Sequence, residues 1–364
     1  MTQTLRILLA GGGTGGHIYG GIALAEALQE MRPEAQVLFV GTSFGLEKDI
    51  VPQKGWELKT LKVKPLKGSK LSARLKSLFN LPQALFQAFK IVKKFKPHLV
   101  IGIGGYASAP TIIAARLQKI FTAIIEQNAY PGLTNRKLAP WVNRIFVAFE
   151  KALKFFDPKK TFVTGNPVRS FKRKQIDKEK NPFTIFILGG SQGASSLNEA
   201  MIASLDLLKD FQGSLHFIHQ TGKKDYERVK AAYEKAGFSH EVYDFIQEVG
   251  PSYEKTNLAI ARAGAGTITE LRLYGIPAIL VPYPYAADDH QRLNALDMTE
   301  HGAAEMVLNQ NLSPELLAEK IKYYLSSPSA LEQMGLMALK QAKPMAAKKI
   351  LEYCLLSSEL SKLL

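Results

Sequence analysis

Three glycine-rich turns, at residues 11–16, 102–105 and 189–193, each follow a short apolar segment of the kind that forms a buried strand. Glycine lets backbone N–H groups approach an anion closely, and the N-terminus of the following helix adds a partial positive charge. One such turn is weak support for a binding site. Three turns, divided between the two halves of the chain, predict two nucleotide- or phosphate-binding folds that face one cleft.

The first turn runs directly into His17. An imidazole at the junction of a glycine turn and a helix can act as a base near neutral pH, although it could equally serve only as a hydrogen-bonded residue at the helix start. The glycines at 11, 13 and 16 match a dinucleotide-binding turn, which also requires an acidic residue at the end of the second strand. That strand ends in Gly41-Thr42-Ser43, which argues against an NAD site.

In the second half of the chain, the run at residues 262–270 follows an apolar segment and begins a predicted helix with small residues. Its backbone amides and Thr267 would suit a diphosphate, and Glu270 could accept hydrogen bonds from two ribose hydroxyls. A plain helix start with an acid in its first turn is the alternative. The polar cluster at 285–294 follows the next strand and could bind sugar hydroxyls.

Other kinds of chemistry find little support in the sequence. Asp288 and Asp289 are adjacent, and such a pair alone is poor support for a Mg²⁺ site. His216 and His219 lie three residues apart in a predicted strand and face opposite sides, so we do not expect them to share a metal. Neither a G-x-S-x-G hydrolase turn nor a Walker loop occurs. We therefore expect neither a metal nor a cofactor.

These residues stand at the ends of alternating strands and helices. Several predicted strands are apolar throughout, which indicates parallel sheets covered on both faces and a doubly wound α/β architecture. A polar, lysine-rich connector at 170–182 follows a boundary near 164–169, and the last helices are expected at 313–326, capped by Ser313, and at 330–364. The predicted strands are residues 5–10, 37–41, 99–103, 122–126, 144–147, 183–188, 215–218, 242–246, 258–261 and 278–281.

Length and composition suit two domains of an ordinary globular protein. The chain has 364 residues, 46% of them hydrophobic, and no apolar run approaches the length needed to cross a bilayer. The single cysteine, Cys354, excludes an intrachain disulfide and fits a reducing cytoplasm. We expect Cys354 to be a small buried hydrophobic residue rather than a reactive thiol.

The net charge of +15 is concentrated in one segment, because residues 62–96 hold ten basic residues and no acidic one. The apolar residues Leu71, Leu75 and Leu78 recur at helical spacing, with a break expected at Pro82. A basic amphipathic segment favours an anionic membrane surface, with a solvated helix face as the alternative. The aromatic residues follow the apolar face and do not form a base-stacking platform, which argues against nucleic acid.

Taken together, the chain resembles the MurG family, bacterial N-acetylglucosaminyltransferases that convert lipid I to lipid II in peptidoglycan synthesis. The resemblance spans nearly the whole chain. It rests on the order of seven motifs: GGTGGH at 12–17, GGYAS at 104–108, EQN with PGLTNR at 126–136, GNPVR at 165–169, GGSQGA at 189–194, AGAGTITE at 263–270 and DDHQRLNA at 288–295.

The resemblance implies a GT-B fold, in which two doubly wound, Rossmann-like parallel-sheet domains face a cleft. An N-terminal acceptor- and membrane-facing domain would span 1–168, joined by a C-terminal helix at about 345–364. A UDP-sugar-binding domain would span 169–344. The implied partners are UDP-N-acetylglucosamine, lipid I, an anionic membrane surface and other cell-wall synthesis proteins, but no nucleic acid. The implied location is peripheral, on the cytoplasmic face of the cell membrane.

The resemblance assigns the family's functional residues to the positions of this chain that match its motifs. Ile246 would lie by the uracil, Glu270 on the ribose and Gln291 on the sugar, while Gly104, Gly105 and Tyr106 would help to hold the acceptor's diphosphate. The full set implied for the donor is Thr14, Gly15, Gly16, Asn128, Arg169, Ser191, Ile246, Ala265, Gly266, Thr267, Ile268, Thr269, Glu270 and Gln291.

The resemblance also implies a mechanism. His17 would take the proton of the muramyl 4-hydroxyl as that oxygen attacks the anomeric carbon from the face opposite UDP, which inverts the centre to a β-1,4 linkage. Amides near 264–267 would stabilise charge on the leaving diphosphate. The family often has histidine before the EQN motif, whereas this chain has Ile125, which puts a contact from that position in doubt and favours His17 as the base.

Two alternatives stay open on the sequence. A related GT-B enzyme, such as a lipid galactosyltransferase or a UDP-sugar epimerase, would share most of these features. A non-catalytic, basic module that binds membranes or nucleotides is an alternative from a different class.

Overall fold

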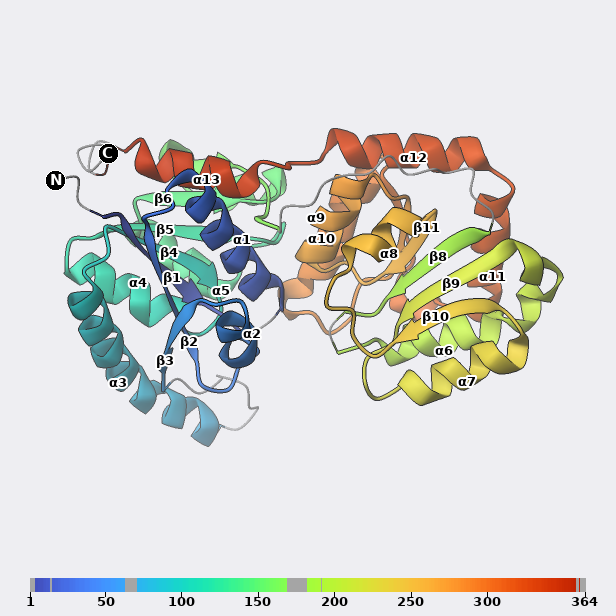
Figure 1. Ribbon diagram of the computed structural model, residues 1–364, viewed down its shortest axis with the longest axis horizontal. Coiled ribbons are helices and arrows are strands. Elements are labelled where there is room, and N and C mark those ends of the chain that lie inside the picture. Colours follow the sequence, from blue (N-terminus) through green and yellow to red (C-terminus); the bar gives the residue numbers. More distant parts are fainter. Residues whose placement is uncertain are drawn as a thin grey trace. The chain divides into compact units, whose positions relative to one another are not determined.

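The computed structural model describes residues 4–13, 15–62, 71–168, 182–190, 192–357 and 360, with the backbone alone described for 71–81. The chain divides into two compact units (Figure 1). Unit 1 comprises Met1–Ser170 and Lys343–Leu364, and unit 2 comprises Phe171–Ala342. The acceptor and donor roles predicted for the two domains stay predictions.

Unit 1 contains a seven-stranded parallel sheet in the order β3-β2-β1-β4-β5-β6-β7. Its strands are β1 (Arg6–Gly11), β2 (Gln36–Thr42), β3 (Glu57–Leu61), β4 (Leu99–Gly104), β5 (Phe121–Glu126), β6 (Arg144–Val147) and β7 (Thr161–Val163). Its helices are α1 (Gly15–Met31), α2 (Glu47–Gln53), α3 (Leu71–Phe95), α4 (Ser108–Leu117), α5 (Leu133–Leu138) and α13 (Ala346–Leu355), with short 3₁₀ turns at Ala139–Trp141, Glu150–Phe155 and Pro158–Lys160.

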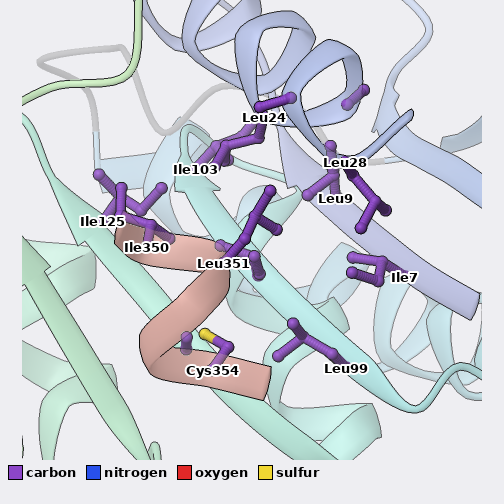
Figure 2. Close-up of a cluster of buried hydrophobic side chains, with 14 of the residues drawn as sticks. Ile7, Leu9, Leu24, Leu28, Leu99, Ile103, Ile125, Ile350, Leu351 and Cys354 are labelled. Atoms are coloured by element: carbon purple, nitrogen blue, oxygen red, sulfur yellow. The ribbon is translucent and has the colours of Figure 1, made fainter. Parts of the chain in front are cut away.

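Alternate residues along each strand of unit 1 enter two different cores. Ile7 and Leu9 of β1 pack with α1 and α13 on one face, whereas Leu8 and Ala10 pack with α3 and α4 on the other. Figure 2 shows Ile350 and Leu351 of α13 directed into the first core. Because both faces are covered, the central strand β4 is apolar throughout and β1 is apolar after its first residue, as the sequence shows.

Unit 2 contains a six-stranded parallel sheet in the order β10-β9-β8-β11-β12-β13. Its strands are β8 (Phe183–Leu188), β9 (Leu215–Gln220), β10 (Ser239–Tyr243), β11 (Leu258–Ala261), β12 (Ala278–Leu280) and β13 (Ala304–Met306). Its α-helices are α6 (Ser195–Ser204), α7 (Tyr226–Ala236), α8 (Gly250–Lys255), α9 (Ala265–Tyr274), α10 (His290–Glu300), α11 (Pro314–Leu325) and α12 (Pro328–Lys340). The predicted doubly wound α/β architecture is confirmed in both units.

Several sequence-based boundaries are wrong for physical reasons. The edge strand β10 lies at Ser239–Tyr243 rather than 242–246, because a strand that pairs on one side only does not need an apolar run. The edge strands β3, β7 and β13 are absent from the predicted strands for the same reason. The connector predicted at 170–182 lies almost entirely outside the described residues.

Two helix predictions also need correction. Helix α3 does not break at Pro82, which lies inside it. Proline removes only one backbone hydrogen bond there, and Ala84, Ala88 and Val92 continue an apolar face that is buried after it. The single helix expected at 330–364 is two helices, because the chain leaves α12 at Gln341 and begins α13 only after Pro344. The cap predicted at Ser313 is confirmed, since its hydroxyl accepts a hydrogen bond from the Leu316 N–H at 3.2 Å.

Helix α13 holds the end of the chain to unit 1 through a few buried residues. Ile350 is fully buried, and Cys354 is a buried free thiol whose pKa is raised by burial, as expected for a structural cysteine. We predict that Ile350→Ala lowers the free energy of unfolding of unit 1 by about 2–5 kcal/mol, because it leaves a cavity. Both tryptophans of the chain, Trp56 and Trp141, lie in unit 1, so urea denaturation followed by tryptophan fluorescence reports on this unit.

The exposed residue Lys349, on the same helix, supplies the control. Lys349→Ala is expected to change the free energy of unfolding by less than about 0.5 kcal/mol. Equal effects of the two substitutions would contradict the packing role of α13.

Candidate functional site

The two glycine turns of unit 1 pack directly against each other at the carboxyl ends of the adjacent strands β1 and β4. The Gly12 N–H donates a hydrogen bond to the Gly104 carbonyl oxygen at 3.1 Å. Gly105 has a φ of +83°, and a Cβ there would lie 2.2 Å from the Gly12 oxygen. Only glycine permits this approach of two backbones. The structure therefore brings together turns that are about ninety residues apart in the sequence.

His17 lies in the first turn of α1, half-buried beside the second glycine turn. Its Nδ1 is 3.2 Å from the Gly12 carbonyl oxygen, which can only accept a hydrogen bond, so Nδ1 carries the proton. In the neutral ring Nε2 is then the basic nitrogen. A Cβ on Gly104 would lie 2.7 Å from that Nε2. The predicted base thus lies against the turn predicted to hold the acceptor's diphosphate.

A third loop of unit 1, after β5, is organised by Glu126. Its buried carboxylate accepts hydrogen bonds from the Asn128 N–H at 2.9 Å and from the Asn135 side chain at 2.8 Å. Burial raises the pKa of Glu126, and these donors act in the opposite direction. The Gln127 amide donates to the Gly16 oxygen at 3.4 Å. Asn128 is therefore held in a loop tied to the first glycine turn.

Ile125 takes a structural role in this region. Its side chain is buried in the core that α13 completes, beside Ile350 (Figure 2). The chain therefore replaces the family's frequent histidine with a core residue.

In unit 2, one side chain joins two parts of the predicted donor site. Gln220, at the end of β9, donates from Nε2 to the Gly190 oxygen at 3.0 Å. Its Oε1 accepts from the Ile246 N–H at 2.9 Å. The turn at 189–193 and the residue predicted to contact uracil are therefore fixed relative to each other. Ser191 itself, like Thr14 and Arg169, lies outside the described residues.

The N-terminus of α9 has the form expected of an anion site. Its N-cap is Gly264, which has no side chain to cap the helix, and the first amide to bond back to Gly264 is that of Ile268, at 3.0 Å. The amides of Ala265, Gly266 and Thr267 precede that bond and are directed out of the helix end. The side chain of Ile268 is buried in the core, and the Thr269 hydroxyl donates to the Ala265 oxygen at 2.8 Å. Both residues are thus built into the helix.

Glu270 and Gln291, the residues predicted to contact ribose and sugar, are positioned by neighbours in unit 2. The buried Tyr253 phenol donates to Glu270 Oε2 at 3.0 Å. Burial, with the Glu270 carboxylate adding to it, holds the pKa of Tyr253 well above its usual range, so the phenol remains a donor. Gln291 Oε1 accepts from the Tyr283 N–H at 2.9 Å.

Sequence reasoning missed the residues that hold these loops in place. The buried Arg262 guanidinium donates to the Val281 oxygen at 3.0 Å and to the Ser196 hydroxyl at 2.8 Å, and desolvation lowers its pKa. Before α10, Asp288 and Asp289 both adopt φ of +52°, a left-handed conformation that is strained in non-glycine residues. No sequence signal marks the partners of Arg262 or Gln220, because those partners lie on segments that are distant in the sequence.

A buried network lies behind the glycine turn of unit 2. His219 Nε2 pairs with Asn198 Oδ1 at 3.0 Å, and the Asn198 amide donates to Asp225 at 3.0 Å. A Cβ on Gly193 would lie 2.0 Å from the Thr221 oxygen, which also accepts from Asn198. The network therefore supports the turn from inside. Within the parts of the chain that the structure describes, no three histidine, cysteine or acidic side chains gather as metal ligands would.

Comparison with known proteins identifies the family. The Glycosyltransferase family 28 N-terminal domain matches residues 7–147, and the Glycosyltransferase family 28 C-terminal domain matches residues 184–350. The chain belongs to glycosyltransferase family 28. It is thus a glycosyltransferase, with the GT-B fold of this family.

Curated relatives match over nearly their full length. The chain is 42% identical to a protein of Myxococcus xanthus over 96% of this chain and 92% of the relative. It is 43% identical to one of Syntrophus aciditrophicus over 97% and 99%. Both are named UDP-N-acetylglucosamine--N-acetylmuramyl-(pentapeptide) pyrophosphoryl-undecaprenol N-acetylglucosamine transferase.

Solved structures share the fold. Acinetobacter baumannii MurG superposes with a TM-score of 0.77 at 30% identity, over 96% of this chain and 99% of that one. UDP-GlcNAc 2-epimerase from Neisseria meningitidis, bound to UDP-GlcNAc, superposes at 0.65 with 14% identity, over 97% and 100%. The second similarity shows the fold alone.

The network behind the glycine turn of unit 2 predicts a pH dependence. Burial lowers the pKa of His219 to about 3, against about 6.5 when unfolded. Between these values the unfolded chain binds a proton that the folded chain does not, so stability falls as pH falls from about 6.5 towards 3. From pH 6.5 to 5 this loss amounts to about 2 kcal/mol. Hydrogen exchange of the β9 amides, measured across this pH range, should show this loss of stability.

His219→Gln removes the titrating group and is the control for this effect. The variant should be less stable than the parent chain at pH 7.5, and the difference should shrink by pH 5. A difference that stays constant with pH would contradict the assignment.

Proposed function

We propose that this glycosyltransferase moves N-acetylglucosamine from UDP-N-acetylglucosamine to the 4-hydroxyl of the muramyl sugar of lipid I, the undecaprenyl-diphosphate-linked MurNAc-pentapeptide. The names of relatives 42–43% identical over nearly the whole chain support this substrate pair. The observation that carries the proposal is the placement of His17 Nε2 against the second glycine turn of unit 1. A base there adjoins a backbone suited to an anion.

The donor would bind unit 2. The amides of 265–267 face the diphosphate, Glu270 takes the ribose hydroxyls, and the backbone at Ile246 receives the uracil. Support comes from the bare N-terminus of α9, from the Tyr253 hydrogen bond that orients Glu270, and from the Gln220 bridge to Ile246. Preorganised donors of this kind stabilise charge that appears on the leaving group.

The acceptor would bind unit 1, its diphosphate at Gly104, Gly105 and Tyr106 before α4. His17 Nε2 removes the proton from the sugar hydroxyl while that oxygen forms a bond to the anomeric carbon. The bond from that carbon to the UDP oxygen breaks, and UDP leaves with the electron pair. Attack opposite the leaving group inverts the anomeric centre and gives the β-linked product.

We further propose that unit 1 docks peripherally on an anionic membrane through α3 and α4, which pack together. Phe86 is 59% exposed with the Lys90 ammonium 4.3 Å from its ring centre, and Leu117 of α4 is 62% exposed. Lys93 and Lys94 of α3, the helix that carries Phe86 and Lys90, are also exposed. Exposed apolar groups flanked by lysines suit an interface with anionic lipids. No helix of the described chain has both the length and the apolar character needed to cross a bilayer.

Transfer of labelled N-acetylglucosamine to a short-chain lipid I analogue tests the function, with UDP-galactose as a competing donor and with EDTA present. Acceptor-dependent transfer selective for the N-acetylglucosamine donor is expected. His17→Ala should lower turnover by roughly 100-fold or more, because it removes the base. His240→Ala, a histidine of unit 2 outside the predicted site, should leave turnover near normal.

Two results would count against the proposal. Binding of UDP without transfer would contradict the proposed substrates. It would favour another UDP-sugar enzyme, such as the galactosyltransferase or epimerase alternatives. Near-normal turnover of folded His17→Ala would remove His17 as the base while leaving the substrates in place.

The membrane proposal is tested by vesicle sedimentation. The double variant Lys90→Glu/Lys94→Glu should bind vesicles of phosphatidylglycerol and phosphatidylcholine more weakly than the parent chain, and added salt should narrow the difference by screening. Lys235→Glu/Lys340→Glu changes the net charge equally on exposed residues of unit 2 and is the matched control. Equal losses in both double variants would show that only net charge matters and would contradict docking through α3.

A further inference from the structure

Glu47, the first residue of α2, is a buried acid that the mechanism above does not use. Its side chain is 1% exposed. Oε1 accepts hydrogen bonds from the Thr42 N–H at 2.8 Å and the Thr42 hydroxyl at 2.6 Å. Oε2 accepts from the Gly13 N–H at 2.8 Å. One carboxylate therefore joins the end of β2 to the first glycine turn.

Three glycines from different segments make room for this carboxylate. A Cβ on Gly12 would lie 2.3 Å from Glu47 Cδ, one on Gly41 would lie 2.5 Å from Cγ, and one on Gly45 would lie 2.1 Å from Oε2. Any larger residue at these positions would displace the carboxylate. The fold thus builds a close-fitting cradle for one acidic side chain.

The position of the carboxylate changes the role expected of the first glycine turn. The Gly13 N–H, just before α1, is a group that a bound phosphate would contact in a phosphate-binding turn. Here it already donates to an anion that belongs to the chain. A phosphate brought to the same place would meet a like charge, so this turn is poorly suited to a diphosphate.

The same contact fixes the orientation of His17. Gly12 lies between two anchors, because its own N–H donates to Gly104 and the next N–H donates to Glu47. The Gly12 oxygen in turn accepts from His17 Nδ1. If Gly13 were released, the peptide that sets the ring of His17 would lose one of its two supports.

We propose that Glu47 is a positioning residue for the transfer reaction, and that its carboxylate holds the first glycine turn so that His17 Nε2 is directed at the acceptor hydroxyl. This inference rests on the proposed function, in which His17 is the base. It assigns the first glycine turn to the alignment of that base rather than to binding of a diphosphate.

Glu47→Gln is the test substitution. The amide oxygen keeps the two Thr42 donors, whereas the amide NH₂ faces the Gly13 N–H, donor against donor, and releases it. The matched control is Thr42→Val, which removes the hydroxyl that donates to the same carboxylate and accepts from the Gly45 N–H, but leaves the Gly13 bond intact. Both variants change one hydrogen-bonding group in the same buried cluster, so their melting temperatures should fall by similar amounts.

We expect Glu47→Gln to lower kcat by roughly 10- to 100-fold, since small misplacements of a catalytic group have effects of this size. The donor KM and the Kd for UDP should stay within about twofold, and Thr42→Val should retain kcat within about threefold. Parallel losses of kcat in the two variants, or near-normal kcat in Glu47→Gln, would overturn the inference.

A second readout does not depend on turnover. In the histidine-labelled enzyme, the ring ¹⁵N resonances of His17, assigned with His17→Ala, should shift in Glu47→Gln and stay in place in Thr42→Val. Unchanged His17 resonances in Glu47→Gln would overturn the inference even if the parent enzyme proved to use other substrates. Absence of transfer by the parent chain would instead contradict the proposed function.

Gly45→Ala covers the case in which Glu47→Gln does not fold. It keeps the carboxylate but places a methyl group in its cradle, so the same kcat loss and the same shift at His17 are expected. Retention of both parental values would count against the positioning role.

Discussion

The contact between the two glycine turns of unit 1 is the constraint on which the rest of the site depends. One N–H···O bond, from Gly12 to Gly104, joins the ends of β1 and β4 where no side chain would fit. The contact requires these strands to be neighbours, which the doubly wound order provides by returning the chain to β1 after β3. With the backbones so close, the imidazole of His17 is directed across the second turn.

Unit 2 combines a close backbone approach with support from side chains. A Cβ on Gly193 would lie 2.0 Å from the Thr221 oxygen, while Gln220 bridges Gly190 to Ile246 and Asn198 bonds to the strand end behind the turn. Two charged side chains of this unit are held by hydrogen bonds, Arg262 to the Ser196 hydroxyl and Glu270 to the buried Tyr253 phenol. A site for an anionic nucleotide needs fixed hydrogen-bond donors, whereas a base that takes the proton of a hydroxyl must be a fixed acceptor. In the proposed function, unit 2 supplies the amide donors at the start of α9 for the nucleotide, and unit 1 supplies His17 Nε2 as the acceptor of the hydroxyl proton.

Much of this could be predicted from the sequence, because buried parallel strands and glycine turns leave local patterns. The fold class, the core strands and the cap at Ser313 follow from such patterns. The edge strands β3, β7 and β13 do not, since one-sided pairing imposes no apolar run. The continuity of α3 through Pro82 depends on packing after the proline. The bonds between the Gly13 N–H and Glu47, and between Gln220 and both Gly190 and Ile246, join side chains to distant backbone atoms, and no residue pattern records a backbone partner. Ile125 shows a further limit of prediction from sequence. Its departure from the family pattern is visible in the sequence, but its place in the core is seen only in the structure.

The most direct test of this account is the turnover of Gly104→Ala beside that of Gly55→Ala. Both glycines adopt left-handed φ, +99° and +81°, so both substitutions add similar backbone strain. A Cβ at Gly55 would meet nothing within 4 Å, whereas one at Gly104 would meet the ring of His17. If the contact between the two turns positions His17, Gly104→Ala loses turnover by roughly 100-fold with UDP affinity unchanged, while Gly55→Ala stays near normal. Comparable turnover in the two variants would contradict it.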